Sequence, residues 1–143
     1  MPFIMAKVNQ KITAQQKYQL KSGLGQAIGF VPGKSEEVLM VGIEDQYDLY
    51  LHGDDRVNLA YISVAIYGIP HHEGYVNLNL AITKLFYEVL KIHPENIFID
   101  YADIRAWGNS GYFIDGKGVH VPDKNASSSF DFETYCEEID REE

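Results

Sequence analysis

A proline stands at position 2, directly before an apolar run that is typical of a β-strand. Proline has no N–H to donate to a sheet, so it is tolerated only at the first residue of a strand, at an edge or at a bulge. Two interpretations of Pro2 compete. It simply begins the strand, or it becomes a chain-terminal secondary amine once Met1 has been removed. Only the second allows chemistry, because a proline nitrogen bonded to Met1 is an amide and accepts no proton.

A terminal amine at this position would be a good base. A free α-amine titrates near ~8, and desolvation or a nearby cation lowers its pKa towards neutrality. A base whose pKa lies near the working pH transfers protons most efficiently. The small size of proline favours removal of Met1, so the chemical interpretation of Pro2 is self-consistent.

The residues that follow predict the elements that must position such a base. Phe3–Val8 is typical of a strand, and a helix follows it. Thr13 and Gln16 form a capping-box pattern at the helix start. The further elements predicted are a strand at Val38–Ile43, a strand within 59–68, a helix whose apolar stripe runs from Leu78 to Leu90, a strand at 97–101 and a glycine-rich hairpin within 105–114.

This order predicts two βαβ units in tandem, with an offset of about 59 residues between them. Two helices on one face of a four-stranded sheet give a two-layer α/β sandwich. The other face carries mixed apolar and aromatic groups, among them Tyr61, Tyr67 and Phe98. An uncovered face of that kind is usually buried against another subunit, so we expect a closed homo-oligomer.

Composition limits the classes of function. The 143 residues are 45% hydrophobic, with a formal net charge of −9, which argues against a protein that follows nucleic-acid phosphates. No apolar run is long enough to span a membrane, and no signal-peptide pattern is present, so we expect a cytoplasmic protein. The single cysteine, Cys136, excludes an internal disulfide and a CxxC motif.

Four segments, in this order and spacing, resemble the macrophage migration inhibitory factor family of the tautomerase superfamily. They are "MPFIMAKVN", the pair Gly33–Lys34, "AYISVAIYG" and "HPENIFIDYADIRAWGNSGYF". The resemblance spans about residues 2–113. It implies a homotrimer with active sites between subunits, a mature N-terminal proline as catalytic base, and no cofactor.

The resemblance also implies roles for other residues of this chain. Lys34 would reach the pocket beside Pro2, hold a substrate carboxylate or enolate oxygen, and lower the pKa of Pro2. The alternative is an ordinary solvated loop lysine. Tyr67 would offer its backbone N–H to substrate. Trp107 would belong to the aromatic segment that walls the pocket, with Tyr112 and Phe113, or would simply pack at an interface.

Phe98 and Asp100 depart from the family pattern. They occupy positions at which family members present a tyrosine and an asparagine from the neighbouring subunit. Asp100 would place a carboxylate near Pro2, raise the pKa of the proline and repel anionic substrates. Either Lys34 offsets this by pairing with Asp100, or Asp100 itself acts as an acid or orients water. The departures weaken an assignment of phenylpyruvate or dopachrome-type activity.

Two further features complete the sequence-based prediction. His71–His72 lacks the third ligand that a metal site needs, so we expect no metal. The chain is predicted to divide into a domain over 1–115 and an acidic extension over 116–143. Disorder is the default for the extension, although Phe130, Phe132 and Tyr135 offer aromatic groups that could dock on a neighbour.

The preferred hypothesis is a cytoplasmic, trimeric tautomerase that moves a proton on a small, carboxylate-bearing keto or enol acid. Pro2 and Lys34 would be catalytic, and Tyr67, Phe98, Asp100 and Trp107 would contact the substrate. A decarboxylase or hydratase assisted by Asp100 is the alternative among enzymes. A non-catalytic, cytokine-like binding module is the alternative outside them.

Overall fold

The computed structural model describes residues 1–123 and 137–141. The chain divides into two compact units, residues 1–104 and 105–143. Phe130, Phe132, Tyr135 and Cys136, which the sequence analysis singled out, lie outside the described residues. The predicted boundary near residue 115 stays a prediction.

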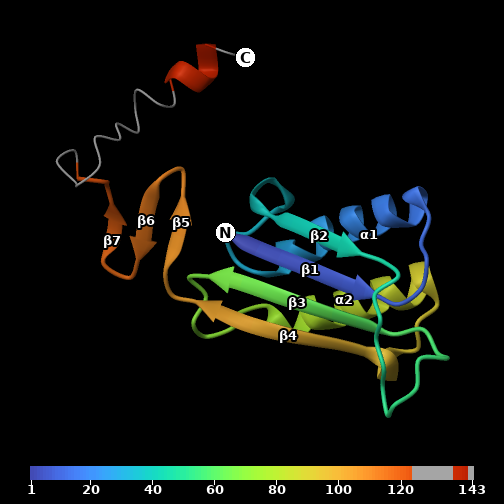
Figure 1. Cartoon of the computed structure of the whole chain (residues 1–143). Coiled ribbons are helices and arrows are strands. Elements are labelled where there is room, and N and C mark those ends of the chain that lie inside the picture. The colour runs from blue at the N-terminus through green and yellow to red at the C-terminus, as the bar shows by residue number, and fades with distance from the viewer. Residues whose placement is uncertain (124–136, 142–143) are drawn as a thin grey trace. The chain divides into compact units, whose positions relative to one another are not determined.

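The first unit is a four-stranded sheet with both of its α-helices on one face (Figure 1). The strand order is β2-β1-β3-β4, with β1 and β2 parallel, β3 and β4 parallel, and β1 antiparallel to β3. This confirms the predicted two-layer sandwich of tandem βαβ units. The elements are β1 (Pro2–Val8), α1 (Ala14–Ala27), η1 (Ile28–Phe30), η2 (Glu36–Val38), β2 (Met40–Glu44), β3 (Ala60–Tyr67), α2 (Tyr75–Leu90), η3 (Pro94–Asn96) and β4 (Ile97–Ile104).

Apolar side chains from the sheet and both helices form one core between the two layers. On β1 and β3 every second residue is buried, so the alternation predicted for the third strand is confirmed. The helical stripes predicted from the sequence supply the other side of the core. Its fully buried members include Ile4, Leu20, Leu24, Ile28, Ile62, Ile66, Leu78, Ile82 and Phe86.

Helix α1 begins with the predicted capping box. The Gln16 backbone N–H donates to the Thr13 hydroxyl at 3.0 Å, and the Thr13 N–H donates to the Gln16 side chain at 2.8 Å. Two backbone donors at the helix start are thereby satisfied. Strand β2 differs from the prediction: it begins at Met40, two residues late, because residues 36–38 turn into a 3₁₀ helix.

The face of the sheet that the helices leave open carries side chains from all four strands. The register places Lys7, Tyr61 and Phe98 in one row and Met5, Ser63 and Asp100 in the next. Tyr61 and Phe98 are among its exposed members. We call this surface the open face; its further members are Phe3, Met40, Gly42, Glu44, Ala65, Tyr67, Ala102 and Ile104.

The second unit contains the predicted hairpin. Strands β5 (Trp107–Asn109), β6 (Tyr112–Asp115) and β7 (Gly118–His120) form an antiparallel sheet. A two-residue turn, Ser110 and Gly111, joins the first two strands with positive φ at both residues. That geometry matches the twist of a hairpin. In the described residues no helix is long and apolar enough to cross a membrane.

We predict that Gly74→Ala destabilises the first unit by about 2 kcal/mol or more. A Cβ at Gly74 would lie 2.0 Å from the Phe30 carbonyl oxygen, and its φ of +82° already disfavours a side chain. Gly53→Ala is the matched control, because its φ is +74° but nothing lies within 4 Å of the added atom. Urea unfolding measures both, and an equal loss in the two variants would contradict the close packing at Gly74.

Candidate functional site

Pro2 is the first residue of a central strand and is buried. It pairs with Ile66 on β3, while β2 begins its pairing with β1 one residue later, at Phe3. The missing N–H therefore falls where the ladder begins, as the sequence predicts. Met1 precedes Pro2 in the structure, so the Pro2 nitrogen is an amide and the free amine belongs to Met1.

The terminal amine lies beside Lys34. Burial first, and then the Lys34 ammonium with its hydrogen bond to the amine, lower the pKa of the Met1 amine from 8.0 to about 6. Both causes act in the same direction, because each disfavours the protonated form. The structure thus places Lys34 next to the N-terminal end of β1, which we call the head of β1, and a catalytic role of this lysine stays a prediction.

A tight turn positions Lys34. Residues 31–34 read Val-Pro-Gly-Lys, and the Lys34 N–H donates to the Val31 carbonyl at 3.1 Å. Gly33, the third residue, has a φ of +75°. A positive-φ residue in third place is the requirement of a type II turn, and proline in second place is common in it. The turn follows η1, whose Phe30 carbonyl packs on Gly74 before α2, so that the lysine loop is fixed to the second helix.

Tyr67 lies at the same end of the sheet. It is the last residue of β3, directly after Ile66, the partner of Pro2. The structure therefore brings together Pro2, Lys34 and Tyr67, three of the six residues that the sequence analysis assigned to the site. The ring of Tyr67 belongs to the open face and is half-buried.

Phe98 and Asp100 lie elsewhere in the single chain. Both belong to the open face, whereas the Pro2 side chain belongs to the helix-covered face. Asp100 pairs with Ser63, three residues before Ile66, which is roughly 10 Å along the strand. The suggested pairing of Lys34 with Asp100 is not formed within the chain. Instead the Tyr61 hydroxyl donates to Asp100 Oδ2 at 2.7 Å.

Trp107 begins β5 in the second unit and is half-buried. Trp107 belongs to the second unit and Pro2 to the first, so the assignment of Trp107 to the pocket wall stays a prediction. Tyr112 and Phe113 lie on β6 of the same small sheet.

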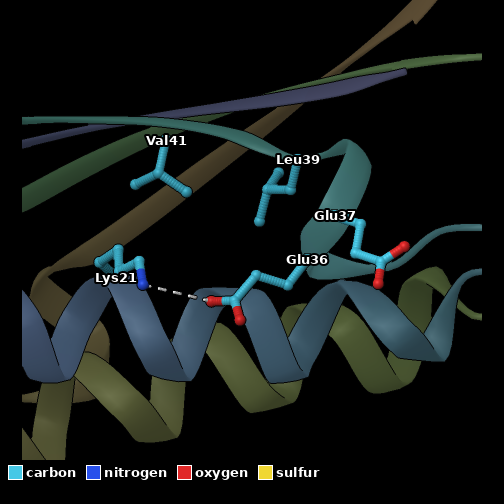
Figure 2. Close-up of a pocket in the computed structure, with 5 residues that line it drawn as sticks. All are labelled: Lys21, Glu36, Glu37, Leu39 and Val41. Atoms are coloured by element: carbon cyan, nitrogen blue, oxygen red, sulfur yellow. Dashed lines mark ion pairs between the residues drawn. The ribbon is translucent and has the colours of Figure 1, made fainter.

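A cavity of about 470 Å³ opens between α1 and the start of β2, on the helix-covered side (Figure 2). Leu39 and Val41 face α1 across it, and Lys21 Nζ lies 3.8 Å from Glu36 Oε2. Glu37 completes the lining. None of the predicted site residues lines this cavity, so it is separate from the head of β1.

The two histidines of the His71–His72 pair have different surroundings. His72 Nε2 lies 2.9 Å from both carboxylate oxygens of Asp103, and its ring stacks on Tyr75 with centroids 4.9 Å apart. His71 is exposed. Within the described ranges, no three His, Cys, Asp or Glu residues are grouped so that they could hold a metal ion.

Sequence reasoning placed Tyr61 on the open face but gave it no partner. The pairing with Asp100 depends on the β3–β4 register, in which Tyr61 lies beside Phe98 and therefore diagonally from Asp100. Aligning the two parallel strands by their burial pattern is the signal that would have revealed it.

No protein-family model and no curated protein sequence matches the chain. Solved structures do. MIF2 from Leishmania major superposes with a TM-score of 0.69 at 21% identity, over 76% of this chain and 93% of that one. The chain has the macrophage migration inhibitory factor fold. The resemblance predicted from the sequence is thereby confirmed for the fold.

Two other solved structures share the fold at lower identity. A fused 4-OT in the form of a symmetric trimer superposes with a TM-score of 0.63 at 18% identity, over 71% of this chain and 85% of that one. The protein Pt0534, inactivated by 2-oxo-3-pentynoate, gives a TM-score of 0.63 at 16% identity, with the same coverage of both chains. These likenesses concern architecture alone.

We predict that Lys34→Gln raises the pKa of the terminal amine from about 6 part of the way towards 8.0. The return is incomplete because burial, the larger cause, remains. The rate of acylation of the amine against pH, followed by mass spectrometry, measures the pKa of whichever residue begins the purified chain. Lys84→Gln on the outer surface of α2 is the control, and an equal effect there would refute the pairing.

Proposed function

We propose that the chain is a tautomerase that works as a homotrimer and uses Pro2 as its general base after removal of Met1. The observation that carries the proposal is the environment at the head of β1. There a terminal amine is partly buried beside Lys34, and its pKa is lowered to about 6. At pH 7 an amine with that pKa is about 90% unprotonated and ready to accept a proton.

Removal of Met1 would transfer this environment to the ring nitrogen of Pro2. The nitrogen lies at the first residue of a buried central strand, so its position is fixed by the β1–β3 ladder. It would take a proton from the carbon next to the carbonyl of a small keto acid. The same nitrogen would then return the proton to the enolate at another atom, and the reaction needs no cofactor.

Lys34 would stabilise the negative charge that develops on the carbonyl oxygen. Its ammonium is held near the amine by the type II turn, so little reorganisation is needed as the charge forms. A carboxylate on the substrate would bind the same ammonium. The backbone N–H of Tyr67, at the end of β3, would orient the substrate.

The trimer would complete the site. Phe98 and Asp100 lie on the open face and away from Pro2 of their own chain, so they reach a site only on a neighbouring protomer. The open face includes exposed Tyr61, Phe98 and Met40, a surface suited to burial between protomers. The symmetric 4-OT trimer, which shares the fold, is an example of such an assembly.

We predict that Pro2→Ala lowers kcat/KM for enol–keto interconversion by about a hundredfold or more, the usual contribution of a general base. Activity is followed by the ultraviolet absorbance of the enol forms of several α-keto acids. Pro94→Ala, a proline of the exposed turn before β4, is the matched control. The proposal fails if the native chain retains Met1 in intact-mass spectrometry, or if Pro2→Ala remains fully active.

We predict one covalent adduct when the mature protein is treated with 2-oxo-3-pentynoate, the compound that inactivates Pt0534. The nucleophile would be the unprotonated Pro2 nitrogen, so labelling should rise with pH as that amine loses its proton, and burial beside Lys34 should place this rise below the ordinary pKa of an α-amine. Peptide mass mapping should place the adduct on the N-terminal peptide. An adduct on Lys34 or elsewhere, with Pro2 unmodified, would reject Pro2 as the reactive amine.

We predict a particle of three times the 16.2 kDa chain mass in light scattering after size exclusion. Ala65→Arg should reduce it to the monomer mass, because Ala65 lies on the open face between Phe3 and Ala102, where a long charged side chain would stand in the surface that the trimer buries. Gln19→Arg, on the exposed surface of α1, should leave the mass unchanged. A monomeric wild-type chain would contradict the trimer.

A further inference from the structure

Tyr61 and Asp100 form a specific pair on the open face. The Tyr61 hydroxyl donates to Asp100 Oδ2 at 2.7 Å. This length is typical of a hydroxyl bound to an ionised carboxylate, which is about twice as strong as a bond between neutral groups. The hydrogen bond, together with the Asp100 charge, raises the pKa of the Tyr61 hydroxyl. Tyr61 therefore remains a donor across the physiological pH range.

The register explains how the pair forms. Tyr61 lies directly beside Phe98 on the neighbouring strand, and Asp100 is the next residue of β4 on the same face. A diagonal neighbour at this spacing is within reach of a long aromatic side chain. The bond uses Oδ2, and among the described residues no donor engages Oδ1. The carboxylate is thus fixed in orientation, with one oxygen left for another molecule.

We propose that Tyr61 is a positioning residue that presents Asp100 as a fixed carboxylate to the site of the neighbouring protomer, where it restricts substrates to neutral and monoanionic keto or enol compounds. This inference rests on the proposed function and its trimer. It goes beyond them by naming the substrate class and a residue that sets it.

Charge balance carries the argument. Lys34 is the cation that the structure places at the head of β1, and it can match one substrate carboxylate. A carboxylate held in the same site offsets that single positive charge. A second substrate carboxylate would then face Asp100 without a partner, and like charges a few ångströms apart repel strongly where water is excluded. Oδ1 would instead accept a hydrogen bond from an enol hydroxyl.

Phe98 sharpens the selection. It lies beside Tyr61 and offers no donor of its own, so at this point of β4 the donor to Asp100 is the Tyr61 hydroxyl from β3. Where the family pattern has a tyrosine on β4, this chain places its phenol one strand away and directs it to the carboxylate. A substrate carboxylate therefore meets an apolar ring and a fixed anion.

The test compares two enol substrates, phenylpyruvate as the monocarboxylate and oxaloacetate as the dicarboxylate. The quantity measured is the ratio of their kcat/KM values, in which any uniform loss of activity cancels. Asp100→Asn should move the ratio towards the dicarboxylate by about tenfold, because the repelling charge is removed without loss of size. Tyr61→Phe should move it in the same direction by a smaller factor, because the carboxylate is no longer held.

The double variant separates positioning from a merely structural role. In the Asp100→Asn background, Tyr61→Phe should change the ratio no further, because its effect acts through the carboxylate. Tyr87→Phe, on the exposed surface of α2, removes the same hydroxyl and should leave the ratio unchanged. An unchanged ratio in Asp100→Asn, or a Tyr61→Phe effect that simply adds in the double variant, would overturn the inference.

The two proposals fail in different ways. If Pro2→Ala retains full turnover, Pro2 is not the base. The ratio of the two kcat/KM values still measures the effect of the Asp100 carboxylate on substrate choice. If no variant turns over either substrate, calorimetric binding of the two keto acids to wild type and Asp100→Asn replaces the kinetic ratio. Equal binding of the monocarboxylate and the dicarboxylate by both proteins would then reject the role of Asp100.

Discussion

The juxtaposition of a terminal amine and the Lys34 ammonium is the interaction on which the proposed site depends. Burial first, and then the repulsion between two protonated amines, lower the pKa of the Met1 amine to about 6. The backbone at Lys34 is held near the amine by two local contacts. Its turn is closed by the Val31 carbonyl, and the preceding Phe30 carbonyl packs directly on Gly74. A site that needs an unprotonated amine near neutral pH thus obtains it from backbone geometry on two separate segments, together with burial.

The sheet topology decides which residues can join this pair. Because β1 and β3 are antiparallel, the start of β1 lies beside the end of β3, and Pro2 meets Ile66 and then Tyr67. Because β3 and β4 are parallel, Ile66 at this end of β3 pairs with Asp103 of β4 and not with Asp100. Asp103 is itself engaged by His72. The topology therefore places the end of β3, with Tyr67, beside the start of β1. It places Asp100 farther along the sheet, on the open face.

Local patterns in the sequence predicted most of the fold, and tertiary contacts account for what they missed. The capping box at Thr13 and the buried alternation of β3 follow from neighbours in the chain, so they were predicted correctly. The start of β2 was wrong by two residues because a short 3₁₀ helix, which hydrophobic alternation does not reveal, precedes it. Three of the six candidate site residues lie together at one end of the sheet. The partner of Asp100 could not be predicted without the β3–β4 register, since Tyr61 is 39 residues away in the chain.

Asp100, which departs from the family pattern, lies far from Pro2 of its own chain, and this distance limits how the two residues can act together. If both residues act on one substrate, a single chain cannot supply them, because they lie on opposite faces of its sheet and roughly 10 Å apart along the strands. Contact between protomers through the open face is then a condition for activity and not only for stability. The same contact would remove water from the Tyr61–Asp100 pair, and exclusion of water strengthens every charge interaction there. Selection by charge and formation of the trimer would accordingly be properties of one surface, so substitutions that weaken the assembly should also relax the discrimination between mono- and dicarboxylates.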